Sequence, residues 1–312
     1  MKAIILTDFG SVDNLVVTNV NTPAVSDNEV LIQVKAISVN PIDVKTRSGK
    51  GVSSLFNDQN PIILGWDVSG IVVESKSPLF KAGDDVFGMV NFPGFGKAYA
   101  QYVAAPASHL ALKPGSISHA EAAAASLAAL TAFQAVVSHA NVQAGQRVLI
   151  HAAAGGVGHF AVQIAKELGA YVIGTSSAAN KDFVLSLGAD EHIDYKTQTI
   201  AGATQAIDFV LDTIGNENID HSLDVMKPGA TIISIPSGKN EAVKEKAEAK
   251  GMIGYPIRVQ SNGEDMNQLA NLLEQGKIRS HISQTFDFDE MRQAHIQIES
   301  GKTRGKIAVL VP

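Results

Sequence analysis

The stretch Val148-Leu149-Ile150-His151-Ala152-Ala153-Ala154-Gly155-Gly156-Val157-Gly158 decides the fold of this chain. It predicts a buried strand, a glycine-rich turn and then a helix from Val157 to Leu168. Such a turn brings bare backbone N–H groups against a pyrophosphate at the positive end of the helix dipole. Glycine is needed there because a side chain would hold the phosphates away from the main chain. In a G-x-G-x-x-G alignment the three key positions are Ala153, Gly155 and Gly158.

The residues on both sides of the turn support this interpretation. Arg147-Val148-Leu149-Ile150 is apolar and β-branched enough for a central parallel strand. Apolar residues recur at helical spacing after the turn, and Gly169 stands where a helix should end. A second strand follows at Tyr171-Val172-Ile173-Gly174-Thr175. The alternative is a glycine-rich turn without a ligand. The residues predicted to bind a dinucleotide here are Ala153, Gly155, Gly156, Val157 and Gly158.

The end of the second strand indicates which dinucleotide binds. NAD sites usually carry an acidic residue about 20 residues past the glycines, where it bonds the ribose hydroxyls. Here Thr175 and Ser176 occupy that place, and no carboxylate follows until Asp182. Small hydroxyl residues leave room for a 2′-phosphate, and Lys181 can supply the opposite charge. NADPH is therefore favoured over NADH, although Lys181 can also be read as a solvated lysine of a first helical turn.

Bulk composition limits the remaining function classes. The chain has 312 residues, 45% of them hydrophobic, which allows two domains of ordinary size. Its formal net charge of −6 disfavours a nucleic-acid partner. No apolar stretch approaches the roughly 20 residues that span a bilayer, and Asp8 interrupts the first apolar run. We therefore expect no membrane association and a cytoplasmic location.

The chain contains no cysteine. This absence excludes disulfides, thiolate metal ligands and cysteine catalysis.

The pattern of elements changes along the chain. Up to about residue 115, short apolar runs alternate with glycine and proline turns, which predicts a partly open barrel. A helix is expected over 119–137. Strands and helices then alternate, which predicts a doubly wound α/β domain with a parallel sheet. The last part holds a helix at 289–299 and a strand at 307–311 that can rejoin the first domain. The six strands predicted for the parallel sheet are 147–151, 171–175, 191–194, 207–212, 231–235 and 257–260.

Seven motifs in sequence order resemble those of the zinc-independent, quinone oxidoreductase-like branch of the medium-chain dehydrogenase/reductase family. This resemblance covers essentially the whole chain. It implies a GroES-like barrel at 1–118 with 278–312, a Rossmann NADPH-binding domain at 119–277, an active-site cleft between them and a homo-oligomer, most simply a dimer. The motifs are Ser38-Val39-Asn40-Pro41-Ile42-Asp43, Leu64-Gly65-Trp66-Asp67-Val68-Ser69-Gly70, Ala82-Gly83-Asp84-Asp85-Val86, Leu130-Thr131-Ala132, Ala153-Ala154-Gly155-Gly156-Val157-Gly158, Leu187-Gly188-Ala189-Asp190 and Gly301-Lys302-Thr303-Arg304-Gly305-Lys306.

The family also contains zinc alcohol dehydrogenases, so the metal has to be argued from the residues. The catalytic zinc of those relatives uses a cysteine, a histidine and a glutamate or second thiolate. Their G-H-E motif reads Gly65-Trp66-Asp67 here, and an indole offers no lone pair to a metal. We therefore expect no zinc and no other metal. Without a Lewis acid, alcohol oxidation is disfavoured, whereas a quinone or an α,β-unsaturated carbonyl needs less activation.

The predicted activity is thus hydride transfer from NADPH to a small-molecule quinone or enone. The coenzyme carries the chemistry, and the protein aligns it and excludes water, so no dedicated acid or base is expected. Two alternatives stay open: an enoyl-thioester reductase, and a non-catalytic NADPH-binding redox sensor.

The resemblance implies three further cofactor contacts, each with a structural alternative. Asn40 would face the nicotinamide, or else be an Asn-Pro turn residue. Thr131 would contact the nicotinamide, or else lie inside a helix. Tyr195 would pack near the adenosine phosphate, or else be a surface aromatic.

The ends of later strands and a few aromatic residues complete the expected site. Asp212 can cap the helix after its strand instead of serving the ligand. His151 and His159 are expected to be partly buried and satisfied, and Arg304 and Lys306 to be solvated rather than to approach the cofactor. Backbone contacts to the ribose and nicotinamide are expected from Thr213, Ile214, Ile235 and Pro236. An apolar substrate slot, or else ordinary core packing, is expected from Trp66, Phe92 and Phe95.

Overall fold

The chain divides into two units in the computed structural model, which describes residues 1–312. Unit 1 comprises Met1–Leu130 and Val259–Pro312, and unit 2 comprises Thr131–Arg258. The predicted boundaries were 118/119 and 277/278. The first boundary falls later because α2 (His119–Ala124) packs on strands of unit 1. The second falls earlier because α9 (Gly263–Glu274) packs against β8 (Ala111–Leu112) of the same unit.

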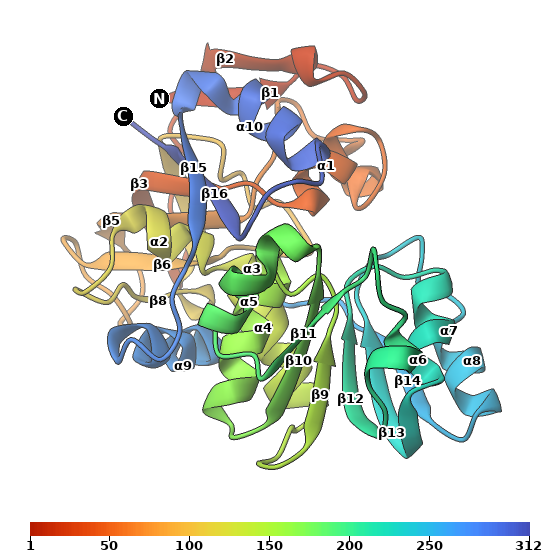
Figure 1. The fold of residues 1–312 in the computed structure, drawn as a ribbon. Helices are drawn as coiled ribbons and strands as arrows, with labels where there is room; N and C mark the ends of the chain where they lie inside the picture. Colours follow the sequence, from red (N-terminus) through yellow and green to blue (C-terminus); the bar gives the residue numbers. More distant parts are fainter. The chain divides into compact units, whose positions relative to one another are not determined.

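Unit 2 is built on a six-stranded, all-parallel sheet in the order β11-β10-β9-β12-β13-β14 (Figure 1). This is the doubly wound order 3-2-1-4-5-6, which confirms the predicted fold class. The order reverses between β9 and β12, and ligands of such sheets bind outside the carboxyl ends of the strands at that point. The strands are β9 (Arg147–Ile150), β10 (Tyr171–Ser176), β11 (Glu191–Asp194), β12 (Ile207–Asp212), β13 (Met226–Ser234) and β14 (Ile253–Pro256).

Helices connect these strands and cover the sheet. Figure 1 shows α4 and α5 beside β9, β10 and β11, and α7 and α8 beside β13 and β14. The middle residues of the central strands are apolar because both faces of the sheet are covered there; Leu149, Ile173, Val210 and Ile232 all belong to one core cluster. The helices of unit 2 are α4 (Gly156–Glu167), α5 (Lys181–Ser186), α6 (Ile200–Ala203), α7 (Glu217–Leu223) and α8 (Val243–Ala249).

Unit 1 contains a larger sheet in the order β15-β16-β3-β5-β6-β8, with β7 also paired to β3, and a small sheet β2-β1-β4. Its helices are α1 (Pro41–Arg47), α2, α9 and α10 (Met291–Glu299). Besides β8, the strands are β1 (Lys2–Leu6), β2 (Leu15–Asn19), β3 (Glu29–Ser38), β4 (Ile62–Ile63), β5 (Asp67–Ser75), β6 (Asp85–Met89), β7 (Tyr102–Pro106), β15 (Ile282–Asp287) and β16 (Lys306–Leu310).

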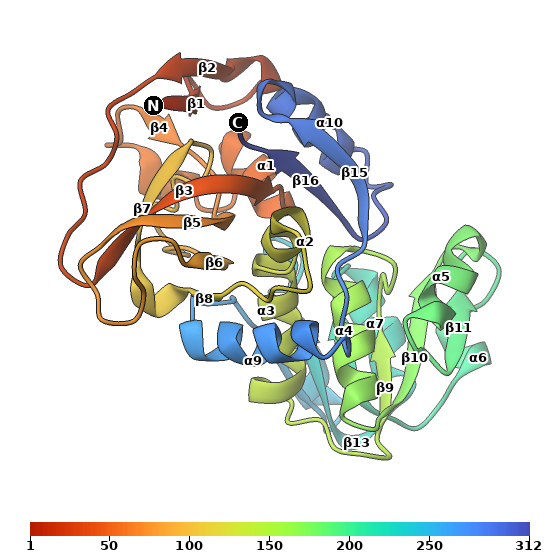
Figure 2. The same cartoon turned by 90° about the vertical axis from the view of Figure 1, so that its left-hand side faces the viewer.

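The C-terminal strand β16 returns to the first sheet, as predicted. It pairs in parallel with β15 and antiparallel with β3, where Val309 faces Ile37 (Figure 2). Residues from opposite ends of the chain thus share one sheet in unit 1.

Two element predictions were wrong in detail. The expected helix 119–137 consists of α2, α3 (Leu127–Phe133) and a π-helical turn at Gln134–His139. The last strand of the parallel sheet is Ile253–Pro256 rather than 257–260, because Thr231 to Ser234 of β13 pair with those residues. None of the helices has the length and apolarity to cross a membrane. Short 3-10 turns lie at Val12–Asn14, Ser53–Phe56, Ala107–His109, Ala178–Asn180 and Phe288–Glu290.

Candidate functional site

The glycine turn follows β9 as predicted. Ala152 has a positive φ of 47°, and α4 begins after Gly155 without a side-chain cap. The first backbone N–H groups of a helix have no partner within it, so an uncapped start suits an anion. A Cβ at Gly158 would lie 2.2 Å from the backbone oxygen of Ala152, so only glycine fits there. Gly155, Gly156 and Val157 are partly exposed.

A buried histidine fixes the backbone on the strand side of this turn. His151 is 1% exposed, and its Nε2 lies 2.9 Å from Ser222 Oγ while its Nδ1 lies 3.1 Å from Thr175 Oγ1. Ser222 donates its only hydroxyl proton to the carbonyl of Asn218, so His151 must donate from Nε2. Thr175 then donates to Nδ1 and accepts from the N–H of Ala152.

Burial lowers the pKa of His151 to about 4, more than the nearby charge of Asp212 raises it. The ring is therefore neutral at physiological pH and links β9, β10 and α7. This confirms the expectation that His151 is satisfied, and the ring is buried completely rather than partly. The same holds for His159, whose Nδ1 lies 2.9 Å from the oxygen of Gly155.

The carboxyl end of β12 is held by a buried carboxylate. Asp212 accepts hydrogen bonds from the backbone N–H of Ile214 and Gly215 and from the side chains of Asn218 and Ser234. It therefore shapes the loop between β12 and α7. The interpretation of Asp212 as a helix cap was wrong, because the N-cap of α7 is Asn216 and no backbone N–H of that helix donates to Asp212. Thr213 donates to the oxygen of His151 at 3.0 Å, and Ile214 is 43% exposed. Ile235 and Pro236, after β13, are half-buried.

Small polar residues gather where β10 and β11 end. Thr175 and Ser176 are 2% and 4% exposed, and the Thr175 hydroxyl is already engaged by His151. Ser176 Oγ lies 2.7 Å from His192 Nε2. Lys181, at the start of α5, is exposed, and Tyr195 is 60% exposed. No carboxylate is present at the end of β10.

Unit 1 encloses a second polar cluster, around Asn40. The Asn40 amide nitrogen donates to Asp67 at 2.7 Å, and Asn40 Oδ1 accepts from the ammonium of Lys306. Lys306 Nζ lies 4.0 Å from Asp67, which also accepts from the N–H of Leu127. Asn40 and Asp43 form a capping box at the start of α1. Asn40 is thus the N-cap of α1, and its contact with a nicotinamide stays a prediction.

Burial dominates the charges in this cluster. It raises the pKa of Asp67 to about 6 and that of Asp43 to about 8, and it lowers the pKa of Lys306. Lys306 is 3% exposed, so the prediction that it is solvated was wrong. Its place in the sheet, facing Asn40 and Asp67, is the reason. Arg304 is half-buried.

The three aromatic residues predicted to line a substrate slot are packed together in unit 1. Trp66 is fully buried, and its indole N–H donates to the oxygen of Gly94 at 2.8 Å. The Trp66 and Phe92 rings lie 5.2 Å apart, edge to face, and Phe56 contacts both Trp66 and Phe95. Trp66 and Phe92 are buried and Phe95 is half-buried, and contact of these three residues with a substrate stays a prediction. Thr131 lies inside α3 and is 2% exposed.

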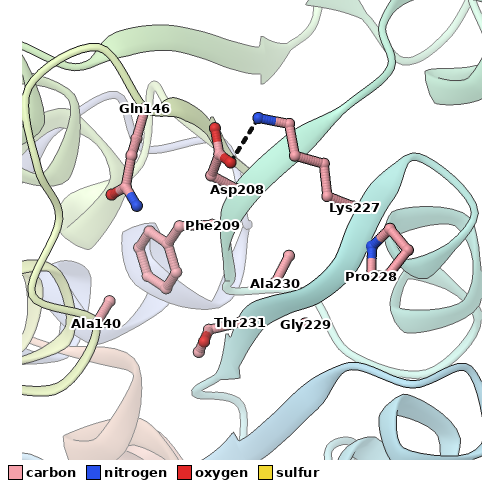
Figure 3. Close-up of a pocket in the computed structure, with 9 residues that line it drawn as sticks. All are labelled: Ala140, Gln146, Asp208, Phe209, Lys227, Pro228, Gly229, Ala230 and Thr231. Atoms are coloured by element: carbon pink, nitrogen blue, oxygen red, sulfur yellow. Dashed lines mark hydrogen bonds and ion pairs between the residues drawn. The ribbon is translucent and has the colours of Figure 1, made fainter.

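A shallow pocket of about 210 Å³ lies at the amino ends of the parallel strands (Figure 3). Lys227 and Asp208, which line it, form an ion pair of 2.6 Å. This is the opposite end of β12 from Asp212, so the pocket is separate from the glycine turn. No group of three or more histidines or carboxylates in the structure is arranged to hold a metal.

Comparison with known proteins gives the family. Residues 26–115 match the model described as alcohol dehydrogenase GroES-like domain, and residues 187–309 match the one described as zinc-binding dehydrogenase. The chain belongs to the medium-chain dehydrogenase/reductase family, in its quinone oxidoreductase-like branch.

Relatives of this family resemble the chain over nearly its whole length. The 2-methylene-furan-3-one reductase of Solanum lycopersicum is 33% identical, and the NADPH-dependent alkenal/one oxidoreductase of Arabidopsis thaliana is 32% identical. Each match covers 99% of this chain and 79% of the relative. The quinone oxidoreductase structure from Coxiella burnetii has a TM-score of 0.95 at 37% identity, covering 100% and 99% of the two chains. The Escherichia coli quinone oxidoreductase complexed with NADPH has a TM-score of 0.89 at 27% identity, covering 100% of both.

Within this dehydrogenase/reductase framework, sequence reasoning missed two features. His192 carries no motif, and only its place at the end of the strand beside β10 could have drawn attention to it. The partners of Asp67 were also missed. Asp67 stands where zinc-containing members have the glutamate of G-H-E, yet here it faces Lys306.

Proposed function

We propose that this protein is an NADPH-dependent reductase that transfers hydride to a quinone or an α,β-unsaturated carbonyl without a metal. The observation that carries the proposal is the uncapped glycine turn after β9, together with hydroxyl side chains and Lys181, rather than a carboxylate, at the end of β10. Its relatives include reductases of this kind.

The described residues fit the coenzyme. The backbone N–H groups of residues 155–158 would hold the pyrophosphate, because glycine at 155 and 156 lets the phosphates approach the main chain at the start of α4. Lys181, Ser176 and Tyr195 would receive the adenosine end. The loops at Thr213–Ile214 and Ile235–Pro236 would contact the ribose and nicotinamide through the backbone.

When bound, NADPH supplies a hydride with its electron pair; a quinone then becomes a hydroquinone anion, or an enone an enolate, and each takes a proton afterwards. The protein residues orient and shield this exchange. Asp212 and His151 serve the loops, and neither is free to act as an acid. Asn40 and Thr131 remain proposed nicotinamide contacts, and Trp66, Phe92 and Phe95 proposed substrate contacts.

The metal-free part of the proposal rests on the donor set. The chain has no cysteine, and Trp66 stands in place of the zinc-binding histidine. A cytoplasmic homodimer stays a prediction.

The test is NADPH oxidation with a panel of a naphthoquinone, a simple enone and an enoyl thioester, before and after treatment with a chelator. We expect turnover of a quinone or enone, unchanged by the chelator, and slower turnover with NADH. Turnover of the thioester alone would favour the enoyl-thioester reductase, and NADPH binding without turnover would favour the redox sensor.

A further inference from the structure

We propose that His192 is a specificity-determining residue of the coenzyme site: once protonated, it joins Lys181 in binding the adenosine 2′-phosphate, so preference for NADPH over NADH increases as pH falls. This inference rests on the proposed function. It adds a residue, and a dependence on pH, that the glycine turn and Lys181 do not imply.

The sheet register places the relevant side chains together. Gly174 of β10 pairs with His192 of β11, and Ser176 pairs with Asp194. Alternation along parallel strands therefore directs Ser176, His192 and Asp194 to one face of the sheet. The α5 helix, which begins with Lys181, packs on these two strands. Opposite His192 on β10 there is only a glycine, so the histidine side chain meets no bulky neighbour from that strand.

Hydrogen bonding determines which nitrogen takes up the proton. Ser176 Oγ is 2.7 Å from His192 Nε2 and 3.1 Å from the oxygen of Ser177. With its single proton directed to Ser177, Ser176 accepts from an Nε2–H of His192. The second proton then enters at Nδ1. The imidazolium has an N–H on both nitrogens, so it keeps the bond to Ser176 and adds a positive charge beside Lys181.

The charged groups that act on His192 are few. Lys181 on α5 lowers the pKa of His192 and Asp194 on its own strand raises it, while burial lowers it most. β10 presents the neutral Ser176. Asp194 already accepts from the N–H of Lys196 and the hydroxyl of Thr197. When His192 is neutral, the charges of Lys181 and Asp194 cancel. When His192 is protonated, the three side chains together carry a net positive charge, which favours binding of a phosphate dianion.

The sign of the pH effect follows. Without coenzyme, His192 is neutral at and above pH 7 because its pKa lies below the usual 6.5. A bound 2′-phosphate favours the protonated ring, so binding of NADP⁺ takes up a proton. NAD⁺ lacks this phosphate and gains nothing from the protonation.

The experiment measures dissociation constants of NADP⁺ and NAD⁺ by calorimetry from about pH 5.5 to about pH 8, for the wild type and His192→Gln. Glutamine can donate to Ser176 from the same place but does not titrate. His281→Gln, which removes a half-buried histidine of unit 1, is the matched control. The phosphate of the free coenzyme titrates near pH 6 whichever variant is present, so this contribution cancels in the comparison.

We expect the wild-type preference for NADP⁺ to increase, relative to His192→Gln, by about five- to tenfold between about pH 8 and about pH 5.5. In ³¹P NMR of the bound coenzyme, the 2′-phosphate should titrate at a lower pH in the wild type than in His192→Gln. His281→Gln should follow the wild type.

Parallel pH profiles of the wild type and His192→Gln would overturn the inference and leave the proposed function standing. Failure of the wild type to bind either dinucleotide would overturn both. A variant that loses affinity for NADP⁺ and NAD⁺ equally at every pH would show a structural role only, and would also overturn the inference.

Discussion

At the scale of single residues, the ionisable side chains enclosed by unit 1 are costly to bury. Asp43, Asp67 and Lys306 are at most 3% exposed. Removing a charge from water costs several kcal/mol unless partners compensate, and here Asn40 lies between Asp67 and Lys306. Asp43 has less compensation, because its Oδ1 lacks a hydrogen-bond partner.

Asp43→Asn should therefore change the pH dependence of stability. The pKa of Asp43 is about 8 in the folded protein and 3.8 in the unfolded chain, so between these values the folded state binds a proton that the unfolded state does not. Stability is thus lost as pH rises through this window, by up to about 1.4 kcal/mol per pH unit. Asparagine removes this loss.

The measurement is urea unfolding between about pH 6.5 and about pH 8, with the variant's free energy of unfolding subtracted from that of the wild type. The difference should fall steadily with pH. A difference that stays constant would show that Asp43 is ionised throughout.

Lys181→Ala should reduce coenzyme discrimination. Lys181 is exposed and is the cation expected to meet the 2′-phosphate, so its loss should lower kcat/KM for NADPH by about tenfold and leave that for NADH unchanged. Steady-state kinetics with both coenzymes checks this. Lys196→Ala, an exposed lysine nearby in the chain, is the control; equal losses with both coenzymes would contradict the assignment.

At the scale of elements, periodicity and glycine spacing predict the parallel sheet well because their physical cause is local. A strand such as β9 is apolar from Val148 to Ile150, where both of its faces are buried, and the turn into α4 needs glycine for steric reasons. The break of the helix after Ala124 is different, because the N–H of Leu127 donates to Asp67 on a distant strand. No pattern in the neighbouring sequence predicts the contact between Leu127 and Asp67.

In the candidate site, too, some features can be predicted from the local sequence and others depend on tertiary packing. The phosphate turn is visible in the sequence, because its function requires glycine. The burial of Lys306 and the partnership of Ser176 with His192 depend on which strands become neighbours, and strand order is settled by tertiary packing. The histidine and lysine therefore look like ordinary surface residues until the fold is known.

Alanine substitutions at two glycines of the turn should distinguish an effect on protein stability from an effect on NADPH binding. A Cβ at Gly158 would meet the backbone oxygen of Ala152 at 2.2 Å, so Gly158→Ala should cost about 1–3 kcal/mol of stability. At Gly155 the corresponding distance is 3.2 Å, and φ is −84°, which alanine tolerates. Gly155→Ala should therefore fold normally but bind NADPH at least about tenfold more weakly, since its methyl group would hold the phosphates away from the turn.

Thermal unfolding and NADPH titration of both variants check these outcomes. Unchanged NADPH affinity in a folded Gly155→Ala protein would argue against phosphate binding at this turn.

At the scale of the whole molecule, unit 1 is assembled from both ends of the chain. β16 lies between β15 and β3, and it carries Lys306 into the cluster with Asn40. Unit 2 takes all six of its strands from one continuous segment.

Truncation after Gly301 should thus affect the two units unequally. Loss of β16 opens the edges of β15 and β3 and leaves Asp67 without its lysine, so unit 1 should lose its native structure. Hydrogen exchange followed by mass spectrometry should show fast exchange in β3 and β5 and continued protection in β9 and β12. Deletion of Pro312 alone is the control, and equal loss of protection in all four strands would contradict the prediction.

The late position of β16 also bears on biosynthesis. A ribosome delivers Thr131–Arg258 in full while the last strand of unit 1 is still untranslated. Unit 2 can therefore complete its sheet during translation, whereas in unit 1 the edge of β3 stays unpaired until β16 has been synthesised. Unit 1, whose first residues leave the ribosome before those of unit 2, is therefore the unit whose sheet is completed last.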